Sequence, residues 1–120
     1  MRGVPDVAAN ADSTTAMALT FTGGVLIPAQ GTSAATPLWA AVIALADQEA
    51  GRHLGFVNPA IYRIAQSGAY HRAFHDVVTG DNSVIWPTGV FVGYEAEPGW
   101  DPVTGWGSPD AQVLVPLLAH

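Results

Sequence analysis

Residues 31–50 read GTSAATPLWAAVIALADQEA, and this stretch decides how the rest of the chain is interpreted. It opens on a glycine turn and continues as an almost unbroken apolar run, with Pro37 tolerated in the first turn of a helix and Gly51 placed to end it. These features predict a helix over residues 34–50. A surface helix of a small domain has one apolar stripe, whereas this one is apolar on nearly every side. We therefore expect more protein around it than this chain supplies.

Composition places the chain among compact globular proteins. It has 120 residues, 49% hydrophobic and 12% charged, which suits one domain or part of one. The chain has ten acidic residues and only four basic ones, all arginines, so there is no basic patch and nucleic acid is not an expected partner. The absence of cysteine excludes disulfides and thiolate chemistry. No apolar run is long enough to cross a bilayer, so no membrane partner is expected, and the first residues lack the apolar stretch of a secretory signal.

Shorter elements are expected on both sides of the long helix. In chain order they are a β-hairpin formed by residues 16–21 and 24–28, a short helix near 60–67 and a final helix over 113–118. Residues 74–107 are predicted to be loop-rich, with many glycines and three tryptophans. Long loops in a compact domain are usually functional or held in place by something else.

Ser33 is the first candidate functional residue, because it follows a glycine and heads the apolar helix. Free amides and the macrodipole at a helix N-terminus favour negative charge, so a serine there can attack a carbonyl while backbone donors face the developing oxyanion. Serine is also a preferred N-cap residue. The residues alone leave both roles open.

Two aspartates in the late loops form a second candidate site. Asp76 lies in FHDVVTGDN at residues 74–82, and Asp101 lies in PGWDPVTGWGSP at residues 98–109. Calcium is bound by several oxygens, commonly carboxylates together with backbone carbonyls of irregular loops. The two aspartates are compatible with such a site, and also with ordinary turn and cap roles.

Both segments resemble the sedolisins, a family of serine-carboxyl peptidases. GTSAATP followed by LWAAVIAL is similar to their nucleophile segment, and the upstream RGVPDVAANAD is similar to the stretch that precedes it. Subtilisins share the Gly-Thr-Ser core but continue differently from the Ala34 and Leu38 found here, and Gln30 stands where sedolisins often have glycine or serine. The resemblance spans nearly the whole chain, from Arg2 to about Leu118, so residues 1–120 are expected to be one part of such a domain. It implies an α/β fold, namely the C-terminal portion of an incomplete subtilisin-like three-layer catalytic domain with a hairpin, a buried helix and calcium-binding loops.

The resemblance also implies the site residues. Ser33 would be the catalytic nucleophile, and Ca2+ would be the cofactor. The metal ligands would be the carboxylates of Asp76 and Asp101 and the backbone carbonyls of Val77, Glu97 and Gly99. Family members often have glycine where Glu97 stands, so the backbone angles available there decide whether its carbonyl can take part.

The function implied is cleavage of peptide or protein substrates at acidic pH, in endopeptidase or tripeptidyl-peptidase mode, by a secreted enzyme. Sedolisins use a glutamate base, an aspartate that orients it and another that stabilises the oxyanion, all upstream of the serine. None has a matching motif here, and Asp6 lies in a structural stretch. A serine without its base is a poor nucleophile, so we expect the chain to be inactive without its partner, the N-terminal part of the catalytic domain.

Two other readings compete with this one. The first is a non-catalytic calcium-binding module derived from the peptidase fold, with a structural or interaction role. The second is a subtilisin-like protease that takes a histidine base from another segment, and the two aspartate loops argue against it. The histidines of this chain are expected to be surface or loop residues: His53, His71, His75 and His120.

Overall fold

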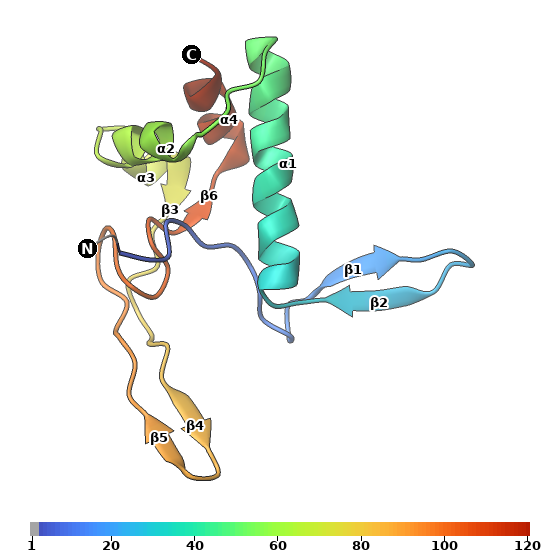
Figure 1. Cartoon of the computed structure of the whole chain (residues 1–120), viewed down its shortest axis with the longest axis vertical. Coiled ribbons are helices and arrows are strands. Elements are labelled where there is room, and N and C mark those ends of the chain that lie inside the picture. The colour runs from blue at the N-terminus through green and yellow to red at the C-terminus, as the bar shows by residue number, and fades with distance from the viewer. Residues whose placement is uncertain (1–2) are drawn as a thin grey trace.

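Helix α1, Thr32–Ala50, is the longest element of the computed structural model, which describes residues 3–120 (Figure 1). Gly31 is its N-cap, and Gly51 ends it in the left-handed conformation that glycine favours. The helix starts before the predicted residue 34, which places Pro37 in the second turn. The prediction of Pro37 in the first turn is therefore wrong.

The predicted N-terminal hairpin is confirmed. Strand β1, Met17–Thr20, pairs antiparallel with β2, Leu26–Ala29, with Met17 opposite Ala29. The turn uses positive φ angles at Gly23 and Gly24, which glycine adopts without a steric penalty. The hairpin projects away from the N-terminal end of α1 (Figure 1). Its exposed large apolar side chains are Leu19, Phe21, Val25, Leu26 and Ile27.

The two later helices are also confirmed, each starting slightly before the predicted residue. Helix α2, Asn58–Ala65, has a proline in its first turn, where the missing N–H is not needed. Helix α4, Ala111–Ala119, is capped by Asp110, whose side chain accepts hydrogen bonds from two amides of the first turn. The start of α4 is thus set by a side-chain cap, whereas the N-cap of α2 is Val57, which provides none, and a proline lies in its first turn.

Residues 74–107 are loop-rich, as predicted, and short strands interrupt the loops. Helix α3, Tyr70–Ala73, leads into β3, Phe74–His75, which pairs antiparallel with β6, Ser108–Pro109. A second hairpin, β4 Val84–Trp86 with β5 Gly89–Phe91, extends from the body of the molecule (Figure 1). The prediction did not name this hairpin, because its glycines and proline are loop signals and its strands are too short to show a period.

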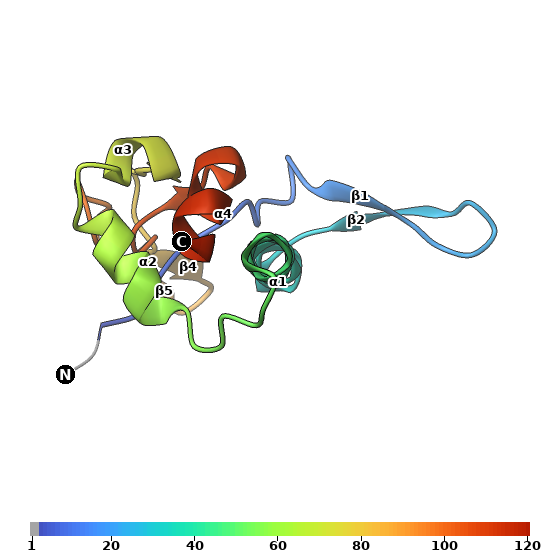
Figure 2. The ribbon, with the colours of Figure 1, turned by 90° about the horizontal axis from the view of Figure 1, so that it is seen from above.

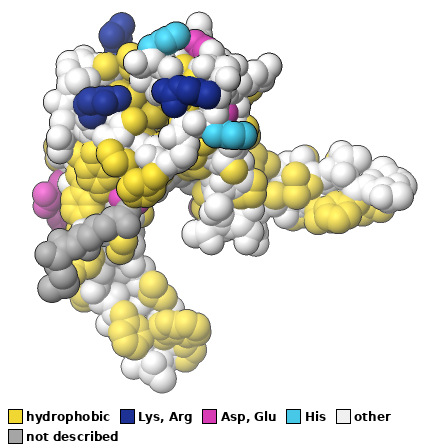
Figure 3. All heavy atoms as spheres, turned by 45° about the horizontal axis from the view of Figure 1, so that its top comes forward, with side chains coloured by type: hydrophobic (Ala, Val, Ile, Leu, Met, Phe, Trp, Pro, Cys, Tyr) yellow, Lys and Arg dark blue, Asp and Glu magenta, His cyan; other side chains and the backbone are white. Residues whose placement is uncertain are grey.

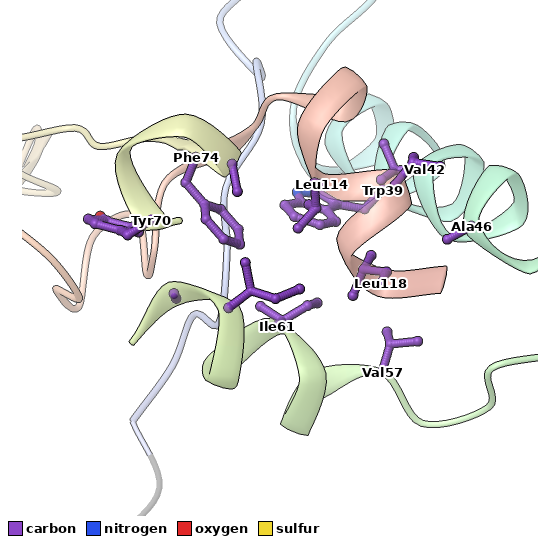
Figure 4. Packing of buried hydrophobic residues seen from close by; sticks show 13 residues of the cluster. Trp39, Val42, Ala46, Val57, Ile61, Tyr70, Phe74, Leu114 and Leu118 are labelled. Atoms are coloured by element: carbon purple, nitrogen blue, oxygen red, sulfur yellow. The ribbon is translucent and has the colours of Figure 1, made fainter. Parts of the chain in front are cut away.

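The core lies where the helices meet. Helix α4 sits between α1 and the α2–α3 pair (Figure 2). Ile61, Phe74 and Leu114 point toward one another at its centre, with Trp39 entering from α1 (Figure 4). The Trp39 indole N–H also donates to the carbonyl of Ala8 at 2.8 Å, which fastens the N-terminal segment to α1.

Helix α1 is buried by this chain along one face only. Its buried residues are Ala34, Trp39, Val42 and Ala46. On other sides apolar residues are exposed, and the side chain of Leu45 is 51% exposed. The enclosure expected for this helix is therefore not supplied within residues 3–120.

The shape of the molecule is open. Its Cα radius of gyration is 16.1 Å, against about 14 Å for a compact domain of this length. The three sheets described are separate two-stranded antiparallel pairs, so a mixed α/β architecture is confirmed but no three-layer arrangement is assembled in residues 3–120. None of the helices described in this range is both long enough and apolar enough to span a membrane.

Candidate functional site

Ser33 lies in the first turn of α1 and is not its N-cap. Gly31 holds that position with φ 70° and ψ −171°, and no side chain caps the helix. The Gly31 carbonyl accepts the amides of Ala34 and Ala35 at 3.0 and 3.3 Å. The amides of Thr32 and Ser33 have no acceptor within residues 3–120. The structural reading of this serine as a cap is therefore excluded, and two backbone donors stand free beside its side chain.

The Ser33 side chain is exposed and has no hydrogen-bond partner among residues 3–120. No histidine or carboxylate of the described chain is in place to take its proton. Pro37, four residues on, has no N–H, so the Ser33 carbonyl also lacks its usual intrahelical donor. This end of α1 thus presents polar groups that the chain itself does not satisfy.

A cavity of about 500 Å3 lies beside this first turn, within the usual size range of ligand sites. Thr32, Ala35 and Thr36 form one wall, and the extended N-terminal segment forms much of another. Ser33 itself does not line the cavity.

Asp6 has a structural role in this arrangement. Its carboxylate accepts hydrogen bonds from the Asn58 side chain at 2.9 Å and the Tyr62 hydroxyl at 2.8 Å. Its carbonyl accepts the amide of Trp106 at 3.0 Å. These contacts fasten the N-terminal segment to α2 and the late loop, in agreement with the structural assignment from sequence.

The histidines are exposed, as expected. The Nδ1 atom of His53 lies 3.0 Å from the Asp47 carboxylate, which also accepts the amide of Leu54 at 2.8 Å. The contact with His53, followed by that with Leu54, lowers the pKa of Asp47. Both residues lie near the C-terminal end of α1, at the opposite end of the helix from Ser33.

Asp101 is the centre of the late loops. Its side chain is 1% exposed, and each carboxylate oxygen accepts two hydrogen bonds. Oδ1 accepts the amides of Val103 and Thr104, both at 2.7 Å. Oδ2 has the longer contacts, with the Glu97 amide at 3.3 Å and the Thr104 hydroxyl at 3.1 Å. Burial raises the pKa of Asp101, but these hydrogen bonds outweigh it and the pKa lies below its ordinary value.

Asp76 is only partly satisfied. Its Oδ2 accepts the amide of Gly99 at 2.9 Å, whereas its Oδ1 is buried without a hydrogen-bond partner. A buried carboxylate oxygen without a donor is costly, and a cation is one way to satisfy it. Burial raises the pKa of the nearby Tyr70 phenol, and the Asp76 carboxylate, with a smaller contribution from Asp101, raises it further. Negative charge is therefore concentrated at this position.

The segment 97–99 lies between the two carboxylates, since the Glu97 amide binds Asp101 and the Gly99 amide binds Asp76. Three backbone carbonyls were expected from the sequence to be ligands, those of Val77, Glu97 and Gly99. None of them accepts a hydrogen bond from residues 3–120. No non-glycine residue described in the structure has a positive φ, so Glu97 does not need the backbone freedom of glycine. The contacts within residues 3–120 thus leave Asp76 Oδ1 and these three carbonyls without donors, whereas each oxygen of the Asp101 carboxylate already accepts two hydrogen bonds.

No group of three or more His, Cys, Asp or Glu side chains able to hold a metal occurs in residues 3–120. The ligand set expected from the sequence has only two such side chains and relies on carbonyls for the rest. Two residues that contact the aspartates were not predicted from the sequence. Thr104 donates to the Asp101 carboxylate, and its position three residues after Asp101 could have indicated this turn. Tyr70 lies near Asp76, and no sequence pattern indicates that proximity.

Several curated proteins are similar to this chain. Kumamolisin from Bacillus sp. is 41% identical over 108 residues, which are 90% of this chain and 18% of kumamolisin. Tripeptidyl-peptidase sed1 from Aspergillus fumigatus is 38% identical over 121 residues, or 98% of this chain and 17% of that protein. Physarolisin from Physarum polycephalum is 38% identical over 122 residues, which are 98% of this chain and 20% of physarolisin. The chain thus spans a fifth or less of these relatives. No protein-family model matches it.

Proposed function

The chain is homologous to the sedolisin peptidases over nearly its whole length, and from this premise we propose that it is the C-terminal part of a serine-carboxyl peptidase catalytic domain. The proposed activity is cleavage of peptides at acidic pH by a secreted enzyme. The placement of Ser33 supports the proposal most directly, since an exposed hydroxyl stands next to two free helix amides.

In the proposed reaction the Ser33 oxygen attacks the carbonyl carbon of the scissile peptide bond. The hydroxyl proton passes to a carboxylate base on the N-terminal part of the catalytic domain and then to the leaving amine. The free amides of Thr32 and Ser33 can donate to the carbonyl oxygen as it becomes negative. Water then releases the acyl group from Ser33. A carboxylate base suits acidic conditions, because it stays partly ionised where histidine is protonated.

The test is to produce the chain together with the N-terminal part and measure peptide cleavage between pH 3 and pH 8. We expect activity only in the assembled protein, with its maximum on the acidic side, and a loss of at least ~1,000-fold in kcat for Ser33→Ala. Ser13→Ala, in an exposed bend before β1, is the control that should keep full activity. Equal activity in Ser33→Ala would contradict the proposal.

We further propose that the late loops bind Ca2+. Asp76 and Asp101 would supply carboxylates, and the carbonyls of Val77, Glu97 and Gly99 would complete the set. The supporting observation is the buried Asp76 Oδ1 without a donor, together with three carbonyls that no described residue bonds. When bound, the ion would neutralise the two carboxylates and hold the loops together.

Thermal unfolding tests the calcium proposal. Calcium should raise Tm, because an ion that binds the folded state alone stabilises it by mass action. Asp76→Asn should abolish the rise, whereas Asp81→Asn, an exposed carboxylate of the same region, should keep it. The same calcium response in both variants would rule out Asp76 as a ligand.

A non-catalytic calcium-binding module is the second candidate. It is favoured by one observation, that no base within residues 3–120 contacts Ser33. The two candidates differ in the cleavage experiment: a module would show the calcium response but no Ser33-dependent activity in any assembly.

A further inference from the structure

The three arginines among the described residues lie on one face of an acidic molecule. The sequence carries a formal charge of −6, yet Figure 3 shows arginine side chains together with histidines on one face. The arginines within residues 3–120 are Arg52, Arg63 and Arg72. Their guanidinium groups form no side-chain hydrogen bond and no ion pair with residues 3–120.

Two acidic groups in the last turns of α1 have other partners. The Asp47 carboxylate is bonded by the His53 ring and the Leu54 amide, and Arg52 adds only the weakest of the contributions that lower the pKa of Asp47. Glu49 lies 3.9 Å from the ring of His120. The arginines therefore remain available to an external anion.

Two of these arginines line a cavity and the third does not. Arg52, in the connection between α1 and α2, and Arg63, on α2, are part of the wall of a cavity of about 290 Å3. His120, at the end of α4, also lines it. The apolar part of the wall is formed by Leu54, Phe56, Val57, Ala60, Leu118 and Ala119. Arg72, on α3, lies outside this set.

We propose that this cavity binds a small carboxylate ligand that carries an apolar group, such as the C-terminal residue of a peptide. Guanidinium groups suit a carboxylate because their planar fork can donate two parallel hydrogen bonds to it. The accessible apolar lining, namely exposed Phe56 with half-buried Leu54 and Ala60, contacts the hydrocarbon part. The volume is at the lower end for ligand sites, which favours a ligand of one or two residues.

This site is separate from the proposed nucleophile. Ser33 is in the first turn of α1, whereas Arg52 follows its last residue, and a helix of this length spans about 28 Å. Binding here does not depend on peptidase activity, so the two proposals can fail independently.

The test is titration of the 120-residue chain with N-acetyl-L-leucine, monitored through backbone amide NMR signals at neutral pH. We expect saturable shifts at Leu54 and Ala60, and none with N-acetyl-L-leucinamide, which lacks the carboxylate. The Arg52→Gln/Arg63→Gln double variant should bind at least tenfold more weakly. The matched control is Arg72→Gln, which removes the same charge from the same face and should bind like the wild type.

Arg63→Lys provides a second variant that keeps the charge and removes the fork, and it should bind several-fold more weakly. The amide spectrum of each variant reports directly whether it is folded. Absence of saturable binding by N-acetyl-L-leucine, equal binding of the leucinamide, or an equal loss in Arg72→Gln would each overturn the proposal.

Discussion

The serine end of the molecule and the carboxylate loops differ in how far the chain completes them. At the serine end, an exposed hydroxyl and two free amides lie in the first turn of α1, and the nearby β1–β2 hairpin exposes most of its apolar side chains. In the carboxylate loops, Asp101 is buried and accepts four hydrogen bonds. Neighbouring Trp106 packs edge-on against Tyr62 and Tyr70.

This difference distinguishes the region that the chain stabilises by its own contacts from the region that needs another part of the catalytic domain. The carboxylate loops are closed by contacts within residues 3–120, and their buried side-chain groups without a partner are Asp76 Oδ1 and the Trp106 indole N–H. The serine end is stabilised mainly by α1 and by the Trp39 contact to Ala8. We therefore expect substitutions in the loops to affect folding, and those at the serine end to affect activity in the assembled enzyme.

The largest effect is expected for Asp101→Ala. It leaves three amides and a hydroxyl without their acceptor in a buried position, which should lower the free energy of unfolding by about 3–5 kcal/mol. Urea unfolding in the presence of a metal chelator measures this loss without a contribution from bound metal. Asp81→Ala, whose carboxylate is exposed, is the control. An effect of Asp101→Ala no larger than that of the control would remove the contrast between the two regions.

At the serine end, the largest stability effect is expected at Gly31. Its φ of 70° with ψ of −171° is a combination open essentially to glycine alone, so Gly31→Ala should cost roughly 1–3 kcal/mol. Gly68→Ala is the matched control, because Gly68 has no positive φ and an added Cβ would meet nothing within 4 Å. If the two variants are equally stable, the turn before Ser33 is not fixed by this backbone conformation.

Acid should weaken the carboxylate loops through Asp101. Because the pKa of Asp101 in the folded protein is below its ordinary value of 3.8, ionised Asp101 stabilises the fold above that pH. This contribution is lost as pH falls through the lowered pKa. The free energy of unfolding of the wild type should therefore fall more steeply below pH 4 than that of Asp101→Asn. Parallel pH profiles would show that Asp101 does not carry this dependence.

The smallest effect on stability is expected for Ser33→Ala. The side chain is exposed and makes no hydrogen bond, so the free energy of unfolding should change by no more than about 0.5 kcal/mol. Urea titration of the isolated chain is the measurement. A loss above ~1 kcal/mol would mean that this hydroxyl has a structural role that the contacts do not reveal.

Much of the local structure could be predicted from the sequence. The long helix, the hairpin before it and the later helices follow from apolar periodicity and from glycine and proline signals, and their starts shift slightly because capping was decided by Gly31 and Asp110. The second hairpin was missed, since Val84–Trp86 and Gly89–Phe91 are too short to show a period. The assignment of the metal ligands was a matter of resemblance and remains a prediction.

The sequence by itself determined the order of elements, the place of Ser33 at the head of an apolar helix and the similarity to the sedolisins. Each of these follows from the identity of residues that are adjacent in the chain. Only the tertiary structure decided that Gly31 rather than Ser33 caps α1, that segment 97–99 lies between Asp76 and Asp101, and that the chain covers one face of α1 alone. The last two outcomes depend on contacts between groups far apart in the chain, which no local sequence pattern predicts. The first depends on the backbone conformation of Gly31, whose amide donates to the carbonyl of Ala11.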